Sequence, residues 1–250
     1  MCIIIAKPAG IAMPTQKVLE HCASKNRDGI GIAWTTAGMI RIKKDFNDLE
    51  AFNKFVGVNV GKADAALIHF RIATSGLVDA GNCHPFPLTR RSKRLRAKES
   101  VTDIAVAHNG TFSDLKGHKK YSDTLIFIKN ILADPIVRNN LHSEAIQELI
   151  KGYIDSSKLA VMDRLGNIMR FGIFWPDEGL FYSNGGFKEY EYQSQTEYSS
   201  MSSRSYQCND CYRMYDLQKT TWDYKVQGWV CDACREHRLN LQYNNTKGES

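Results

Sequence analysis

Four cysteines near the end of the chain restrict its fold more than any other feature. Cys208, Cys211, Cys231 and Cys234 form two C-x-x-C pairs that are separated by 19 residues. Each pair fits a tight turn that presents two thiolates, and four thiolates complete the tetrahedral shell of a structural zinc ion. Redox-active C-x-x-C pairs are the alternative interpretation. The spacing predicts one structural Zn2+ per chain, with no open position for catalysis.

Composition limits the class of protein. The chain has 250 residues, of which 43% are hydrophobic and 24% charged, as in a globular protein with a sizeable core. It contains no apolar run of about 18 residues and no signal-peptide pattern at its start, so we expect neither a membrane span nor secretion. Cys2, Cys22 and Cys83 are scattered. Unpaired thiols and a metal-binding cysteine set suit a reducing compartment, and we expect a cytoplasmic protein.

The pattern of apolar residues predicts both strands and helices. Strands are expected at residues 2–6, 30–35, 39–43, 65–70, 104–107, 159–162, 168–171 and 180–182. The strands at 30–35 and 39–43 flank Thr36-Ala37-Gly38 and are expected to form a hairpin. Helices are expected at residues 15–25, 46–55, 122–131 and 144–154. Because the strands do not strictly alternate with the helices, a layered α+β fold is favoured over a doubly wound one.

Composition also divides the chain into parts. Residues 2–190 are expected to form the main domain. Residues 191–207 are rich in serine and are predicted to be a linker, which the small metal module at 208–238 follows. Residues 239–250 are expected to be a flexible tail.

Positive charge is concentrated between Leu88 and Ser100, which we call the basic segment. It sets six basic residues, Arg90, Arg91, Lys93, Arg94, Arg96 and Lys98, against Glu99, in a chain whose net charge is +6. Such a loop can bind phosphate, nucleic acid through residues 90–98, or an acidic partner. A solvated insertion is the alternative. From Cys208 onward six basic residues balance six acidic ones, so for the metal module a protein partner is favoured over nucleic acid.

Cys2 is a candidate nucleophile. Removal of Met1 would leave its thiol and a free α-amine on one residue. An α-amine titrates near pH ~8 and a thiol near ~8.5, so the amine can take the proton of the thiol. A buried strand residue is the alternative. Cys83 and His84 are a poor candidate pair, because neighbours on a strand point to opposite faces.

Three further segments place reactive residue types at turns. Arg71, within His69–Gly76, offers a planar fork for a carboxylate, or else a surface salt bridge. Asn109 and Gly110 can supply an amide and a backbone N–H to an oxyanion, or else only a turn. Asp123 can hold an ammonium group, or else only stabilise the first turn of a helix.

Together these segments resemble the class II glutamine amidotransferases, which are cysteine-type N-terminal-nucleophile hydrolases, from Cys2 to about Phe187. Asp28–Trp34 resembles the family's D-G-x-G strand entry, and His69–Gly76 resembles its H-x-R-x-A-T-x-G signature. Residues 82–86 and 107–110 resemble the stand-alone branch of the family. The C-terminal module resembles a zinc ribbon.

The resemblance implies a four-layer αββα sandwich and a role for each site residue. Cys2 would attack the side-chain amide of glutamine, Arg71 would bind the α-carboxylate, Asp123 the α-ammonium, Asn109 and Gly110 the oxyanion, and Thr74 would line the pocket. A γ-glutamyl thioester would form, ammonia would leave, and water would release glutamate.

The resemblance leaves the fate of the ammonia open. The residues after the linker are too few for a synthase domain, so ammonia is expected to pass to a partner protein. Alternatively, the chain hydrolyses another γ-glutamyl amide without an acceptor. A third possibility is a silent scaffold that binds nucleic acid or protein through the basic segment and the metal module.

Overall fold

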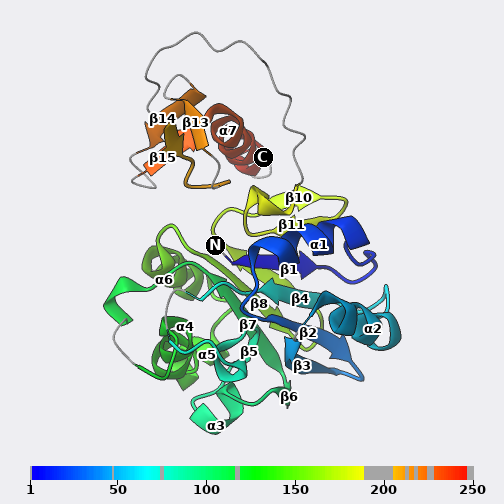
Figure 1. Cartoon of the computed structure of the whole chain (residues 1–250). Helices are drawn as coiled ribbons and strands as arrows, with labels where there is room; N and C mark the ends of the chain where they lie inside the picture. The colour runs from blue at the N-terminus through cyan, green and yellow to red at the C-terminus, as the bar shows by residue number, and fades with distance from the viewer. Residues whose placement is uncertain are drawn as a thin grey trace. The chain divides into compact units, whose positions relative to one another are not determined.

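The computed structural model describes residues 2–46, 48–73, 76–115, 119–188, 205–211, 214–216, 219–223 and 228–246. The chain divides into two compact units, Met1–Ser183 and Asn184–Ser250, which combine helices with several sheets (Figure 1). Among these described residues, no helix has the length and apolar character needed to cross a bilayer.

A seven-stranded sheet organises the first unit, in the order β10-β11-β1-β4-β2-β3-β6. Its strands are β1 (Ile3–Lys7), β2 (Ile30–Thr36), β3 (Met39–Phe46), β4 (Ala66–Phe70), β6 (Glu99–Thr102), β10 (Trp175–Asp177) and β11 (Leu180–Tyr182). Neighbouring strands pair antiparallel. Every residue of β1 is buried, which explains its unbroken apolar run from Ile3 to Ala6.

A second, four-stranded sheet has the order β5-β7-β8-β9. Its strands are β5 (Phe86–Pro87), β7 (Ile104–Asn109), β8 (Lys158–Asp163) and β9 (Ile168–Phe171), and they also pair antiparallel. Alternate residues of a strand point to opposite faces. Ala105 and Ala107 of β7 accordingly belong to one buried cluster, while Val106 belongs to another.

The first of these clusters joins the two sheets. Ile4 and Ala6 of β1 share it with small residues of the second sheet. The members from the second sheet are Ala105, Ala107, Ala160 and Met162. Small side chains let two sheets approach closely, so this cluster brings β7 near the strand that follows Cys2.

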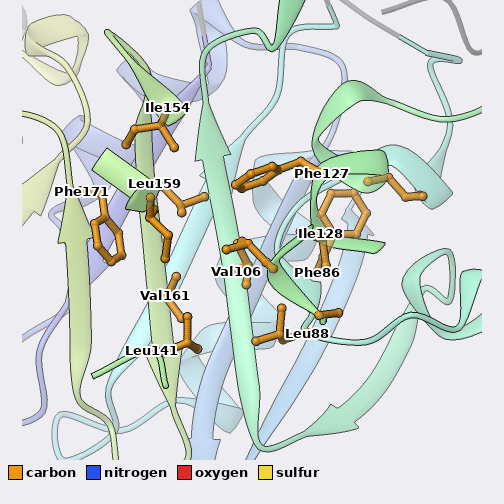
Figure 2. Close-up of a cluster of buried hydrophobic side chains, with 14 of the residues drawn as sticks. Phe86, Leu88, Val106, Phe127, Ile128, Leu141, Ile154, Leu159, Val161 and Phe171 are labelled. Atoms are coloured by element: carbon orange, nitrogen blue, oxygen red, sulfur yellow. The ribbon is translucent and has the colours of Figure 1, made fainter. Parts of the chain in front are cut away.

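The second cluster lies between the four-stranded sheet and helices. The helices described in this unit are α1 (Gln16–Lys25), α2 (Leu49–Asn59), α3 (Ser92–Leu95), α4 (Asp123–Phe127), α5 (Pro135–Asn139) and α6 (Glu144–Ile154). Its short helical turns are η1 (Ala80–Asn82), η2 (Ser113–Leu115) and the π-helical η3 (Ile128–Leu132). Figure 2 shows Val106 and Leu159 of the strands among Phe127 and Ile154 of the helices.

Helix α2 packs on the seven-stranded sheet. The rings of Phe52 and Phe70 have centroids 6.1 Å apart, which places α2 against β4. Side chains cap the first turns of both early helices: Asp48 accepts from the N–H of Ala51 at 2.7 Å, and Thr15 caps α1. Capping satisfies N–H groups that have no partner within the helix.

The structure corrects two sequence expectations here. The helix predicted at 46–55 begins only at Leu49, because Phe46 continues β3 as a buried strand residue. The basic segment was predicted as a loop, and it instead contains α3 and the start of β6, with Leu95 fully buried. The helix at 15–25 and the hairpin of β2 with β3 were correctly predicted.

The second unit contains two hairpins and a helix. Its elements are η4 (Gly185–Phe187), β12 (Ser205–Gln207), β13 (Met214–Asp216), β14 (Thr220–Asp223), β15 (Gly228–Cys231) and α7 (Asp232–Thr246). Strand β12 pairs with β13, and β14 pairs with β15. Most of the predicted linker lies outside the described residues. Helix α7 continues to Thr246, well into the tail that was expected to be flexible from 239.

Three histidines are buried within the first unit. The rings of His69 and His84 lie 4.3 Å apart, and His84 Nδ1 accepts a hydrogen bond from the N–H of His108. Burial lowers the pKa of His69 and of His108 to about 3, and the nearby positive charges of Arg71 and Lys158, respectively, act in the same direction. Burial also lowers the pKa of His84 well below its usual range. All three are neutral in the folded protein at neutral pH.

These histidines predict acid sensitivity. The unfolded chain binds protons on them near pH 6.5, while the folded protein does not, so stability falls as pH drops below about 6.5. Each histidine with a folded pKa near 3 should remove roughly 2 kcal/mol between pH 6.5 and pH 5. We expect His69→Leu to flatten the pH dependence of the free energy of unfolding, measured with urea. His142→Leu, at a largely exposed position, is the control; equal slopes for both variants would contradict the prediction.

Candidate functional site

Cys2 lies directly before β1 and contacts the end of β4. Its sulfur lies 3.3 Å from the N–H donor nitrogen of Ile72 and 3.2 Å from the Ile72 carbonyl oxygen. The register of β1 against β4 produces this contact, because Ile3 is paired with Phe70. The two strands therefore bring the partly exposed Cys2 beside the residue that follows Arg71.

The surroundings of Cys2 do not by themselves favour a thiolate. Burial raises the pKa of the Cys2 thiol, and the hydrogen bond from the Ile72 N–H opposes this effect without cancelling it. A raised pKa leaves little thiolate at neutral pH. Nucleophilic attack at this position therefore needs a base that removes the proton.

Arg71 is buried and held by neutral groups. Its guanidinium donates to the carbonyl of Leu77 at 2.9 Å and to the carbonyl of Asp79 at 3.5 Å. These bonds orient the positive charge and do not cancel it. Thr74, the residue expected to line the pocket, lies outside the described residues, so its role stays a prediction.

Asn109 and Gly110 stand where β7 ends. Asn109 Nδ2 lies 2.9 Å from Ser183 Oγ, which also accepts from the N–H of Ile4 at 2.9 Å. One hydroxyl therefore separates Asn109 from the strand that carries Cys2. Gly110 has a φ of +151°, and an added Cβ would lie 2.1 Å from Ser157 Oγ. Glycine is required here because no side chain fits against Ser157.

Asp123 is the first residue of α4 and is buried. One carboxylate oxygen accepts from the N–H of Phe112 at 2.7 Å, and the other accepts from the N–H of Thr124 at 2.7 Å. These backbone donors fix the carboxylate without neutralising it. The expected ammonium-binding role stays a prediction.

Asn82 links the surroundings of Arg71 to those of Asp123, and sequence reasoning assigned it no role. Its amide nitrogen donates to the carbonyls of Leu77 and Lys120, and its oxygen accepts from the N–H of Ser122. Asn82 thereby joins Leu77, whose carbonyl also holds Arg71, to Ser122 directly before α4. Its partners lie up to 40 residues away, so only its place within a family-like motif could have drawn attention to it.

The rival pair Cys83 and His84 has other partners. Cys83 Sγ lies 3.7 Å from the carbonyl oxygen of Asp28, and His84 Nδ1 accepts from the N–H of His108 at 3.3 Å. Both side chains are buried. These contacts favour structural roles for the two residues.

The basic segment reaches the candidate site through Arg96. Its guanidinium lies 2.6 Å from Asp79 Oδ2 and also donates to the carbonyl of Lys120. Lys98 pairs with Asp45 at 2.7 Å. Arg90 lies 4.0 Å from a carboxylate oxygen of Asp134. Three of the six cations are thus paired with carboxylates of the same chain, which reduces the charge left for nucleic acid or an acidic partner.

The four clustered cysteines form a candidate metal centre in the second unit. Their sulfur atoms lie within 4.8 Å of one another, and the side chains are buried. Cys231 Sγ lies 3.9 Å from Cys211 Sγ, and the N–H of Cys231 donates to Cys208 Sγ. The predicted clustering is confirmed, and four cysteines could hold a metal ion. The identity of the metal stays a prediction.

Other contacts support this small unit. Arg238 of α7 donates to the carboxylates of Asp210 and Asp223, joining the helix to both hairpin regions. The ring of Trp229 packs against Tyr206 and Trp222 at centroid distances of 4.2 Å and 5.7 Å. A core this small needs a further cross-link, which a metal can provide.

Comparison with known proteins gives a distant similarity. The chain is 27% identical over 158 residues to the glutamine–fructose-6-phosphate aminotransferase (isomerizing) of Methanothermobacter thermautotrophicus. The match covers 62% of the chain and 23% of the relative, so the chain spans less than a quarter of that protein's length. No protein-family model matches the chain. The similarity indicates distant homology to a glutamine-dependent enzyme.

We expect about one zinc ion per chain, measured by elemental analysis of the purified protein. Cys208→Ser should remove most of the metal and expose the 208–246 region to proteolysis, because three thiolates hold zinc less tightly than four. Cys2→Ser, in the other unit, is the matched control and should retain the metal. Metal-free wild-type protein, or full metal content in Cys208→Ser, would contradict the prediction.

Proposed function

We propose that this chain hydrolyses the side-chain amide of glutamine through a γ-glutamyl thioester on Cys2. The observation that carries the proposal is the contact of Cys2 Sγ with Ile72, beside the buried cation Arg71. Homology to a glutamine-dependent aminotransferase supports glutamine as the substrate. The whole activity of that relative is not transferred, because the chain spans so little of its length.

The chemistry begins with a proton transfer. After removal of Met1, the α-amine of Cys2 takes the thiol proton, which the raised thiol pKa makes necessary. The sulfur then attacks the amide carbon, and the carbonyl oxygen gains negative charge. Asn109 and the N–H of Gly110 donate to this oxygen. The α-ammonium then gives this proton to the amide nitrogen, the C–N bond breaks, and neutral ammonia leaves as the thioester forms. A water that loses a proton to the α-amine attacks the thioester carbon, and the C–S bond breaks to release glutamate and the thiol.

Arg71 and Asp123 bind the amino-acid end of the substrate in this proposal. Arg71 takes the α-carboxylate and Asp123 the α-ammonium, while Thr74 lines the pocket. Support comes from their partners: carbonyls hold the guanidinium, and backbone N–H groups hold the carboxylate. Both groups are buried in fixed positions, so binding costs little side-chain entropy.

We propose the four-layer αββα sandwich as the fold. It is supported by the apolar cluster between the two sheets and by the clusters that join each sheet to helices. The second unit is proposed to be a zinc ribbon, with Zn2+ held by the four cysteine thiolates. We propose a cytoplasmic location, because cysteines outside disulfides and a metal-binding cysteine set suit a reducing compartment.

The ammonia is proposed to pass to a partner enzyme. The competing proposal is hydrolysis of another γ-glutamyl amide with no acceptor, and it shares the first half-reaction. Glutamine and γ-glutamyl peptides offered in parallel distinguish the two substrate classes.

Cys2→Ala should abolish release of glutamate and ammonia from glutamine, because no nucleophile remains. Intact mass should show that active protein lacks Met1. Cys22→Ala, a change of a buried thiol on α1, is the control and should keep activity. Active protein that retains Met1 would rule out the α-amine as the base, and an active Cys2→Ala would rule out the nucleophile.

Asn109→Ala should lower kcat by roughly 10²-fold, as the loss of an oxyanion donor does. Asn59→Ala, on the exposed part of α2, is the matched control and should leave kcat unchanged. Unfolding midpoints of both variants check that folding is preserved. An unchanged kcat for Asn109→Ala would remove this residue from the oxyanion role.

A further inference from the structure

Ser183 joins three parts of the first unit at one buried hydroxyl. It follows β11 directly, and its side chain is fully buried. Its N–H donates to the carbonyl of Ile4 at 2.9 Å, and its Oγ accepts from the N–H of Ile4 at 2.9 Å. Asn109 Nδ2 lies 2.9 Å from the same Oγ. Ser183 is thus fixed to the strand that follows Cys2 and contacts the candidate oxyanion donor.

In this orientation the amide nitrogen of Asn109 has a hydrogen-bond partner and the amide oxygen has none. Two N–H groups point to Ser183 Oγ, while the buried Oδ1 of Asn109 has no hydrogen-bond partner among the described residues. A buried carbonyl without a partner loses its hydrogen bonds to water and gains none in return, which destabilises the fold. Nitrogen and oxygen of a side-chain amide are assigned from their hydrogen bonds, so the surroundings determine the orientation.

Rotation of the amide by 180° pairs Asn109 Oδ1 with the Ser183 hydroxyl and leaves Nδ2 without a partner among the described residues. Asn109 Oδ1 then accepts from the Ser183 hydroxyl, and Ser183 Oγ still accepts from the N–H of Ile4. Asn109 Nδ2 takes the former place of Oδ1, where no described residue accepts its hydrogen bond, so this donor is left for a substrate oxygen. The hydroxyl serves once as donor and once as acceptor, as its chemistry allows.

We infer that Ser183 is a positioning residue that holds the Asn109 amide with its nitrogen toward the reacting carbonyl. This inference rests on the proposed amide hydrolysis. The N–H of Ile4 polarises the Ser183 hydroxyl, and hydrogen bonds in such a series strengthen one another. A donor fixed before the reaction needs no reorganisation when the oxyanion forms. Ser183 contacts no reacting atom in this arrangement.

Kinetics of Ser183→Ala test the inference. With the amide no longer fixed, kcat for glutamine should fall about 10-fold, which is part of the loss expected for removal of the donor, and KM should change little. Ser100→Ala, on β6 at the far edge of the sheet from β1, is the matched control and should leave both constants unchanged.

A double-mutant cycle separates positioning from a general structural role. In an Asn109→Ala background, Ser183→Ala should cause no further loss of kcat, because the group that it positions is already absent. An equal loss in both backgrounds would overturn the inference.

A neutron structure of the deuterated wild-type protein tests the same arrangement without activity. It should show the Ser183 deuteron directed at Asn109 Oδ1 and both amide deuterons on the opposite side. Amide nitrogen facing Ser183 would overturn the inference, whatever the kinetics. If wild-type protein hydrolyses neither glutamine nor γ-glutamyl peptides, the proposed function fails, while the neutron map still decides how Ser183 orients Asn109.

Discussion

The close packing of the two sheets is the constraint on which the candidate site depends. Ala105 and Ala107 of β7 meet Ile4 and Ala6 of β1 in one buried cluster, and all four are completely buried. Side chains this small allow β7 to lie close to β1, and larger ones would force the sheets apart. The end of β7 therefore comes within one serine hydroxyl of the strand that begins after Cys2.

Packing of the first unit also buries histidine and lysine side chains, and burial lowers their pKa values. His69 of β4 and His108 of β7 precede Arg71 and Asn109 closely in sequence, and both are buried, which lowers their pKa values to about 3. Lys44 is also buried, and burial lowers its pKa to about 7 while its ammonium donates to the carbonyl of Leu95. Several buried polar groups of this unit have structural neighbours: Lys44 has the carbonyl of Leu95, and the ring of His69 has the ring of His84.

Sequence patterns predicted the parts of the fold that local interactions determine. The spacing of apolar residues was enough to predict α1, and two strand patterns on either side of Thr36-Ala37-Gly38 were enough to predict the hairpin of β2 and β3. The four-cysteine cluster was also predictable, because two short turns fix most of its geometry. Strand β6 was missed, because charged and polar residues at the sheet edge lack the apolar alternation of a strand.

Residues that act through distant contacts could not be predicted in the same way. Ser183 is separated from Ile4 by 179 residues and from Asn109 by 74. Asn82 similarly bonds to the segment near Lys120, 38 residues away. A serine or asparagine in a turn has a local explanation in the sequence, so nothing in its neighbours indicates a buried partner on another sheet. These contacts can be recognised only once the folded arrangement of the strands and loops is known.

One cation of the basic segment, Arg96, affects the surroundings of Arg71 through its ion pair with Asp79. The carboxyl of Asp79 is partly buried, which raises its pKa, but the hydrogen bond and charge of Arg96 outweigh this and lower the pKa below its usual value. Asp79 is thus ionised and paired with Arg96 at 2.6 Å, while only its carbonyl accepts from Arg71. An unpaired carboxylate at this place would compete for the Arg71 guanidinium. By engaging Asp79, Arg96 prevents this competition, which is consistent with the proposed role of Arg71 toward a substrate carboxylate.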